Sequence, residues 1–283
     1  MLAHRNDHSS SAAASRFAMD GLSGDLHGDD ATRPGIVLLH GLSFNRRIWD
    51  PVVAELSSLD PTRRVLALDL PGHGDSYELP SYDMDAVTDV LHAALQDAGF
   101  GEPLLVGHSI AAVIATVYGA RFPARGVVNV DQPLQTAPFG EMLRGMAAQL
   151  RSPAFPSIWA AIARDFHTEL LPAGGRERVE ATSNPRQEVV LGYWRQIMDA
   201  PTADLVAFID LTLTRVREQG LPYLVIGGWQ PEPGYLAWLH QQLPQARVVI
   251  LPESGHFPFL AHPERFAREI LDFAANVQTN PHQ

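Results

Sequence analysis

One serine is better placed for nucleophilic chemistry than any other polar residue of this sequence. The segment LLVGHSIAA, residues 104–112, has the pattern of a strand, a sharp turn and a helix, with Ser109 at the turn. Such a turn lifts the hydroxyl off the sheet and points the following backbone N–H groups at whatever the hydroxyl attacks. Gly107 and Ala111 are small enough for so tight a turn, although Ala111 departs from G-x-S-x-G. The alternative interpretation is a structural serine in a strand-to-helix turn.

The segment LLHGLSFNRRIW supplies a second part of a reaction site. Gly41 follows the predicted strand end at His40, and glycine lets the backbone bend so that the N–H of Leu42 can be aimed. Together with the N–H of Ile110, this donor would form a two-donor oxyanion hole. Two more loops fit the same layout: the glycine-rich DLPGHGDS at 69–76 and the histidine-bearing SGHFPFLAHPERF at 254–266.

The elements that must position these residues alternate along the chain. Continuous apolar runs of this kind are typical of parallel strands buried on both faces. They lie at 35–41, 64–72, 103–109, 126–132, 222–228 and 246–256. Helical patterns lie between and after them, at 48–59, 84–98, 110–122, 235–243 and 263–277. This alternation predicts an α/β fold with a doubly wound, mostly parallel sheet.

One interval interrupts the alternation. Residues 133–219 contain several helical patterns and no convincing strand, which predicts a helical cap over the carboxyl ends of the strands. The core would then comprise 16–132 and 220–283. Residues 1–15 are small and polar and predict a disordered tail, and the segment RFAMDGLSGDLHGDD could form an antiparallel hairpin.

The motifs together resemble the α/β-hydrolase superfamily with a helical cap, from about residue 35 to 275. The resemblance rests on H-G after the first long strand, D-L-P-G-H-G-D-S, G-H-S-I-A and S-G-H-F-P-F-L-x-H-P-E-x-F. It implies that Ser109 is the nucleophile and His256 the general base. The other histidines of these motifs then have structural roles: ordering the oxyanion loop (His40), supporting the site (His73), packing inside the elbow (His108) and capping or packing (His262).

The acid of the triad departs from the family pattern. Most members place an Asp after the penultimate strand as G-x-x-D, but here Pro231 stands three positions after Gly228. Glu232 is next and remains an alternative, although it lies between two prolines. Asp131 satisfies the order Ser, acid, His and follows the strand beside that of Ser109. Zearalenone-type lactone hydrolases of this superfamily use an acid from this strand end, so Asp131 is the preferred acid.

The predicted cap is rich in large apolar side chains, most of which pack in its own core. Trp159 and Trp194 are the preferred candidates to reach the substrate. The other predicted substrate-binding residues are Trp229 and Phe257, which flank the acid and base loops and could line the mouth of the pocket, and Gly41 at the oxyanion turn. An apolar pocket with few charges suits a small neutral hydrophobic ester or lactone. No arginine is obviously placed to hold a substrate carboxylate, with Arg46 and Arg47 left open.

Composition excludes several other classes. The net charge of −11 argues against nucleic acid and anionic membranes, and no apolar stretch is long enough for a membrane span. All 21 basic residues are Arg and there is no Cys, which excludes lysine Schiff bases, thiolate catalysis and disulfides.

The sequence shows no metal-binding or nucleotide-binding motif, so no cofactor is expected. The N-terminus lacks a signal-peptide pattern, which favours the cytoplasm. The oligomeric state is open, a homodimer included.

The sequence therefore predicts a cofactor-independent serine hydrolase of a carboxylic ester or lactone, working through an acyl-enzyme. C–C bond hydrolysis and other triad chemistry of the same fold stay as alternatives. A slow ligand receptor on this fold is the alternative outside enzymes.

Overall fold

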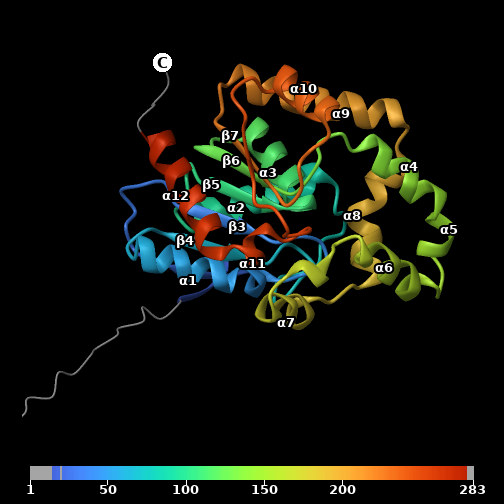
Figure 1. The fold of residues 1–283 in the computed structure, drawn as a ribbon, viewed down its shortest axis with the longest axis horizontal. Coiled ribbons are helices and arrows are strands. Elements are labelled where there is room, and N and C mark those ends of the chain that lie inside the picture. The colour runs from blue at the N-terminus through green and yellow to red at the C-terminus, as the bar shows by residue number, and fades with distance from the viewer. Residues whose placement is uncertain (1–14, 20, 279–283) are drawn as a thin grey trace, which may run out of the picture.

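A computed structural model describes residues 15–19 and 21–278, which contain one eight-stranded sheet (Figure 1). Its strands are β1 (Ser15–Met19), β2 (Leu22–His27), β3 (Ile36–Leu39), β4 (Val65–Leu68), β5 (Leu104–His108), β6 (Gly126–Val130), β7 (Tyr223–Gly227) and β8 (Arg247–Ile250). The order across the sheet is β1-β2-β4-β3-β5-β6-β7-β8. Strands β3 to β8 run parallel to one another, whereas β1 and β2 add an antiparallel hairpin at one edge. This confirms the predicted fold class, and the hairpin forms where it was expected. The predicted tail lies outside the described residues except for Ser15.

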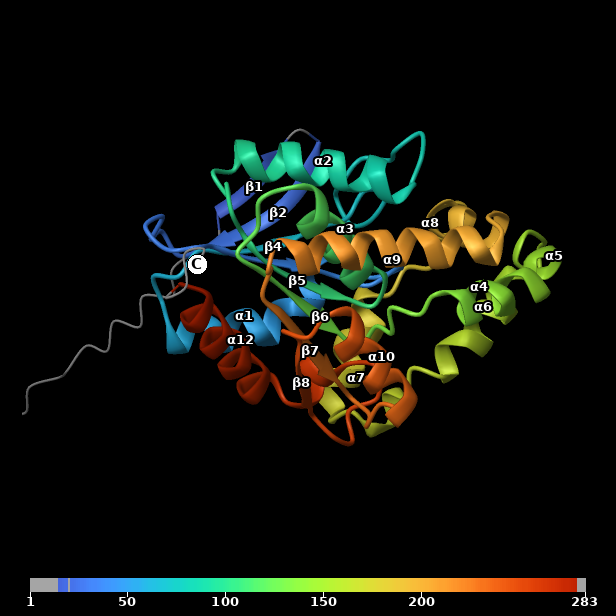
Figure 2. The ribbon, with the colours of Figure 1, turned by 90° about the horizontal axis from the view of Figure 1, so that it is seen from above.

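Helices cover both faces of the sheet (Figure 2). On one face α1 (Asp50–Leu59) packs against α12 (Pro263–Gln278), with the short α11 (Pro258–Ala261) beside them. On the other face α2 (Met84–Asp97) packs against α3 (Ile110–Arg121). The helix α10 (Pro233–Gln242) follows β7, and a 3₁₀ turn, η1 (Arg46–Trp49), leads into α1. No helix in the described part of the chain has both the length and the apolar character that a membrane crossing requires.

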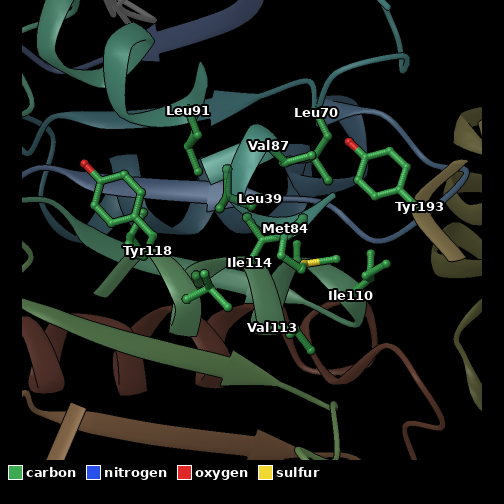
Figure 3. Packing of buried hydrophobic residues seen from close by; sticks show 14 of the residues in the cluster. Leu39, Leu70, Met84, Val87, Leu91, Ile110, Val113, Ile114, Tyr118 and Tyr193 are labelled. Carbon is green, nitrogen blue, oxygen red and sulfur yellow. The ribbon is translucent and has the colours of Figure 1, made fainter. Parts of the chain in front are cut away.

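The continuous apolar runs are explained by the two cores that these helices create. Successive strand residues point to opposite faces, so Val37 and Leu39 of β3 enter the core under α2 and α3. Ile36 and Leu38 of the same strand enter the core under α1 and α12. Figure 3 shows the first of these cores, in which side chains of α2 and α3 close over the sheet. In a strand buried on both faces, a row of polar side chains on either face would be buried, so its sequence does not alternate between apolar and polar residues.

The segment between β6 and β7, called here the helical insertion, contains no strand within 133–219. Its helices are α4 (Ala137–Gly145), α5 (Ala147–Leu150), α6 (Phe155–Arg164), η2 (Thr168–Leu170), α7 (Ala173–Thr182), α8 (Gln187–Asp199) and α9 (Thr202–Glu218). In Figure 1, α4, α5, α6 and α8 lie beyond one end of the strands. The long α9 contacts α3 of the core as well as α4 of the insertion. Tyr193 of α8 is fully buried and donates a hydrogen bond to the Pro71 carbonyl at 3.0 Å.

A buried ionic network connects the hairpin to the loops at the carboxyl ends of the strands. Arg46 is 4% exposed and pairs with Asp25 of β2 at 2.9 Å, with Asp75 at 3.0 Å and with the fully buried Asp69. The backbone N–H of Arg46 also donates to Asp69, at 2.7 Å. Arg46 is thus fully engaged within the protein, which answers the question of whether it is free to hold a substrate carboxylate.

Replacing this arginine should leave a buried carboxylate without its partner. We expect Arg46→Ala to lower the free energy of unfolding by about 3–5 kcal/mol, since an uncompensated buried charge is costly. Urea denaturation followed by circular dichroism measures this loss. Its neighbour Arg47 is exposed and provides the control: Arg47→Ala should change stability by less than about 0.5 kcal/mol. Equal effects of the two substitutions would contradict the role of the network.

Candidate active site

Ser109 occupies a strained turn between β5 and α3. Its φ of 56° and ψ of −130° lie in a region that non-glycine residues rarely adopt. A Cβ on Gly107 would lie 2.2 Å from the carbonyl oxygen of Ala111, so the turn closes only because position 107 has no side chain. Ile110 is the first residue of α3, and its N–H has no acceptor within the helix. The predicted strand, sharp turn and helix are therefore present, with Ser109 at the turn directly before the first residue of the helix.

The loop after β3 lies directly against this elbow. A Cβ on Gly41 would lie 3.3 Å from Ser109 Cβ and 2.8 Å from His108 Nδ1, so glycine permits the close approach. Leu42, Ser109 and Ile110 all line one cavity. The two backbone N–H groups predicted as oxyanion donors, those of Leu42 and Ile110, thus belong to residues gathered around Ser109.

Two buried histidines hold the loop after β3. His40 donates from Nδ1 to the Gly41 carbonyl at 2.8 Å and accepts from the Leu70 N–H at 3.0 Å. His73 donates from Nδ1 to the Pro71 carbonyl at 3.0 Å and accepts from the Ser43 N–H at 3.1 Å. Burial lowers the pKa of His40 to about 4 and that of His73 to about 3. Both rings are neutral at pH 7, and each uses one nitrogen as donor and the other as acceptor.

His256 pairs with Asp131 across the sheet edge. Its Nδ1 lies 2.8 Å from Asp131 Oδ2, while the other carboxylate oxygen accepts the Gly228 N–H at 2.9 Å. Asp131 has a φ of 52° and donates its own N–H to the Ile226 carbonyl at 2.9 Å. Both side chains are about 15% exposed and line the same cavity as Ser109. The structure thus pairs His256 with Asp131 and places both side chains, with Ser109, in the wall of one cavity.

Glu232, the alternative acid, lies elsewhere on the cavity wall. It is exposed, and its backbone carbonyl accepts the Leu236 N–H at the start of α10. The loop after β7 contributes a donor in place of an acid, since the Gly228 N–H binds Asp131. A Cβ on Gly228 would lie 1.9 Å from the Gly255 carbonyl, so this loop passes directly over the loop that carries His256.

The structure also shows contacts of His256 that the sequence did not indicate. The Phe166 ring, from the turn between α6 and η2, stacks on the imidazole with centroids 5.0 Å apart and planes inclined by 23°. The Phe166 carbonyl accepts the His256 N–H at 3.0 Å, and His108 Nε2 donates to the His256 carbonyl at 2.8 Å. Phe166 was one of many aromatic residues in the predicted cap, and no spacing in the sequence distinguishes it.

The insertion reaches the loop after β3 as well. The Asn184 N–H, between α7 and α8, donates to the Ser43 carbonyl at 2.7 Å, and Asn45 Nδ2 donates to the Thr182 carbonyl at 3.3 Å. Ser43 has a φ of 70° and directly follows Leu42. One insertion therefore contacts the backbone on both sides of the site, at the loop of Leu42 and at the loop of His256.

A cavity of about 750 Å³ opens at these residues, and its exposed wall is mainly apolar. The predicted binding residues Trp159, Trp194 and Trp229 line it, as do, among others, Phe44, Val113, Pro138, Phe139, Met142, Ile162, Phe166, Ile197, Val225 and Tyr235. Phe257 and Gly41, the other two predicted substrate-binding residues, are not among the residues that line it. Phe257 is fully buried behind the site, 5.2 Å from the His108 ring, and Gly41 is covered by His108 and Ser109.

Comparisons with known proteins agree with this architecture. Residues 36–269 match the model of the alpha/beta hydrolase family. A pimeloyl-[acyl-carrier protein] methyl ester esterase of Yersinia enterocolitica is 28% identical over 86% of this chain and 94% of its own. The sn-1-specific diacylglycerol lipase ABHD11 of Mus musculus is 26% identical over 90% of this chain and 85% of its own. A thermophilic esterase from Thermogutta terrifontis has a similar structure, with a TM-score of 0.71 at 20% identity, covering 94% of this chain and 99% of its own.

The sheet order, the strained serine turn and the match over most of the chain define the class. The protein belongs to the alpha/beta hydrolase family.

The buried histidines predict a loss of stability in mild acid. In the unfolded chain a histidine binds a proton below pH 6.5, whereas folded His40 and His73 stay neutral until about pH 4 and about pH 3. The unfolded state therefore binds more protons as the pH falls, and the stabilisation present above pH 6.5 is lost. Between pH 7.5 and 5.0 each group should remove about 2 kcal/mol from the free energy of unfolding.

Urea denaturation at the two pH values measures this loss. The variant His73→Asn should lose about 2 kcal/mol less between the same pH values, because one of the titrating groups is gone. An identical free energy of unfolding for the unchanged protein at pH 7.5 and 5.0 would contradict the assignment of neutral buried rings.

Proposed function

We propose that the protein is a serine hydrolase that cleaves a carboxylic ester or lactone of a neutral, hydrophobic compound. The observation that carries this proposal is the hydrogen bond between His256 Nδ1 and Asp131 Oδ2, in the wall of the cavity that Ser109 also lines. The esterases among its relatives support the same reaction.

The proposed reaction uses the residues in distinct roles. Asp131 fixes the His256 ring with Nδ1 as donor, which leaves Nε2 to take the proton of the Ser109 hydroxyl as its oxygen attacks the carbonyl carbon. The Leu42 and Ile110 N–H groups stabilise the negative oxygen of the tetrahedral intermediate. His256 then protonates the leaving alcohol and an acyl-enzyme remains. Water, deprotonated by the same ring, releases the acid and regenerates Ser109.

The lining of the cavity supports a neutral, apolar substrate. Its charged groups, among the described residues, are the carboxylates of Asp131 and Glu232, and no arginine is among them. A carboxylate on the substrate would meet repulsion and no partner, whereas aromatic and aliphatic groups would be buried against Trp159 and Trp194. Both an open-chain ester and a lactone fit this lining, and the placement of the acid after β6 favours the lactone by resemblance alone.

We further propose that residues 133–219 serve as the cap of the site. Four apolar side chains from helices of this segment line the cavity together with Ser109: Phe139, Met142, Trp159 and Trp194. The cap would exclude water from the acyl group and determine which acyl or alcohol group is accepted.

Removing the nucleophile should abolish turnover. Ser109→Ala is expected to lower kcat on p-nitrophenyl butyrate by about 10⁴-fold or more, because the remaining site can polarise the ester but cannot form an acyl-enzyme. Stopped assays of nitrophenol release measure this loss, with circular dichroism to check folding. A fluorophosphonate should phosphonylate Ser109 in the unchanged protein with release of fluoride, and mass spectrometry should find no modified residue in the variant.

A different result would separate the alternatives. Stabilisation by a macrolactone without turnover would favour a ligand receptor, and equal hydrolysis by the unchanged protein and Ser109→Ala would exclude Ser109 as nucleophile.

A paired substitution tests the acid. Asp131→Asn should lower kcat by up to about 10⁴-fold, since an amide neither selects the productive tautomer nor stabilises the imidazolium. Glu232→Gln, the matched control on the same cavity wall, should change kcat by less than about threefold because an exposed charge is screened. The assignment of Asp131 is wrong if only the Glu232 variant loses activity in the same nitrophenyl ester assay.

A further inference from the structure

Three hydrogen bonds involve His256: two bind its backbone and one binds a single ring nitrogen. None of them restrains the tilt of the ring plane. The N–H and carbonyl of His256 are held by Phe166 and His108, at 3.0 and 2.8 Å. Asp131 holds the ring at one corner, through Nδ1. A planar ring fixed at one corner can still tilt about that bond, which would carry Nε2 away from the serine hydroxyl.

The Phe166 ring restricts this tilt. It stacks on the imidazole at 5.0 Å with an inclination of 23°, close to parallel, and it lines the same cavity. A second contact on the imidazole comes from the His108 ring, at 4.5 Å and inclined by 50°. Unlike His108, which belongs to the elbow, Phe166 comes from the insertion.

The backbone around this stack allows only a close fit. Gly255 has a φ of +55°, and a Cβ there would lie 2.6 Å from the Phe166 carbonyl oxygen and 2.8 Å from that of His167. His167 itself is left-handed, with a φ of 52°, and ends the turn that presents Phe166. The left-handed His167 and the absence of a side chain at Gly255 thus bring the turn and the histidine loop into direct contact, which generic packing of a cap would not require.

We propose that Phe166 is a positioning residue for His256, through which the insertion sets the orientation of the general base. This inference rests on the proposed function of His256. It assigns Phe166 a part in the rate of proton transfer, in addition to any contact with substrate, because small errors in the placement of a base are costly.

The substitution Phe166→Leu keeps an apolar side chain and the backbone hydrogen bond but removes the flat ring. We expect kcat on p-nitrophenyl acetate, whose acyl group is too small to fill the cavity, to fall about 10- to 100-fold with KM changed less than about threefold. Phe166→Tyr keeps the ring and should restore kcat to within about threefold of the unchanged protein.

Phe122→Leu is the matched control. Phe122 also stacks on a histidine, the His92 ring, at 4.0 Å with planes inclined by 4°, but it does not line the cavity and makes no ring contact with His256 among the described residues. This variant loses the same kind of stack and should leave kcat and KM on the acetate ester unchanged.

A second measurement needs no substrate. The proton between His256 Nδ1 and Asp131 should give a downfield resonance in the NMR spectrum of the unchanged protein, assigned by its disappearance in Asp131→Asn. We expect this resonance to broaden or shift in Phe166→Leu and to be unaltered in Phe166→Tyr and Phe122→Leu.

The outcomes separate the two proposals. Wild-type kcat with an unaltered resonance in Phe166→Leu would overturn the positioning role, and so would equal losses of kcat in Phe166→Leu and Phe122→Leu. If the unchanged protein hydrolyses no ester, the proposed function has failed, while the resonance still decides whether Phe166 orients the imidazole.

Discussion

The alignment of strand ends in the parallel sheet is the constraint on which the site depends. Leu39 pairs with Gly107, His108 with Val130, Val130 with Ile226, and Gly227 with Ile250, so β3, β5, β6, β7 and β8 all end at one edge. The loops that follow neighbouring strands therefore start one inter-strand spacing apart, although they are far apart in the sequence. A shift of register in any one pair would separate the serine loop from the acid or the histidine loop. The burial of both faces of each strand fixes that register, because a slip would disrupt both cores.

Strain is concentrated where these loops meet. Among the described residues, non-glycine residues with positive φ are Ser43, Ser109, Asp131, His167 and Glu253. All five lie in the loops around the cavity or in the insertion turn beside it. Each such conformation costs roughly 1–3 kcal/mol and persists only because the two cores and the loop hydrogen bonds over-determine it. The stability of the sheet and its helices thus supports a set of backbone conformations that would not form in isolation.

The sequence predicted those parts of the site that local rules determine. Short apolar runs located the strands, and the requirement for small residues in a tight turn located Ser109. Asp131 could be predicted as the acid because parallel strands end together and Pro231 occupies the position of the usual acid. Such local rules could not predict contacts between residues that are far apart in the sequence. Nothing in the sequence indicated that Phe166 would stack on His256, or that Phe257 would turn into the core. Those two outcomes depend on how the insertion folds back onto the sheet.

The two backbone contacts between the insertion and the core divide its surface into regions that can evolve differently. The segment from Phe166 to Asn184 binds the loops of His256 and Leu42, so a change in its length or course would move reacting groups. The helix α4 contributes Phe139 and Met142 to the cavity wall and lies outside both contacts. A lineage could therefore acquire new substrates through α4 while the same chemistry is retained. Exchanging the whole insertion with that of a relative would instead require the incoming segment to supply its own matching donor and acceptor.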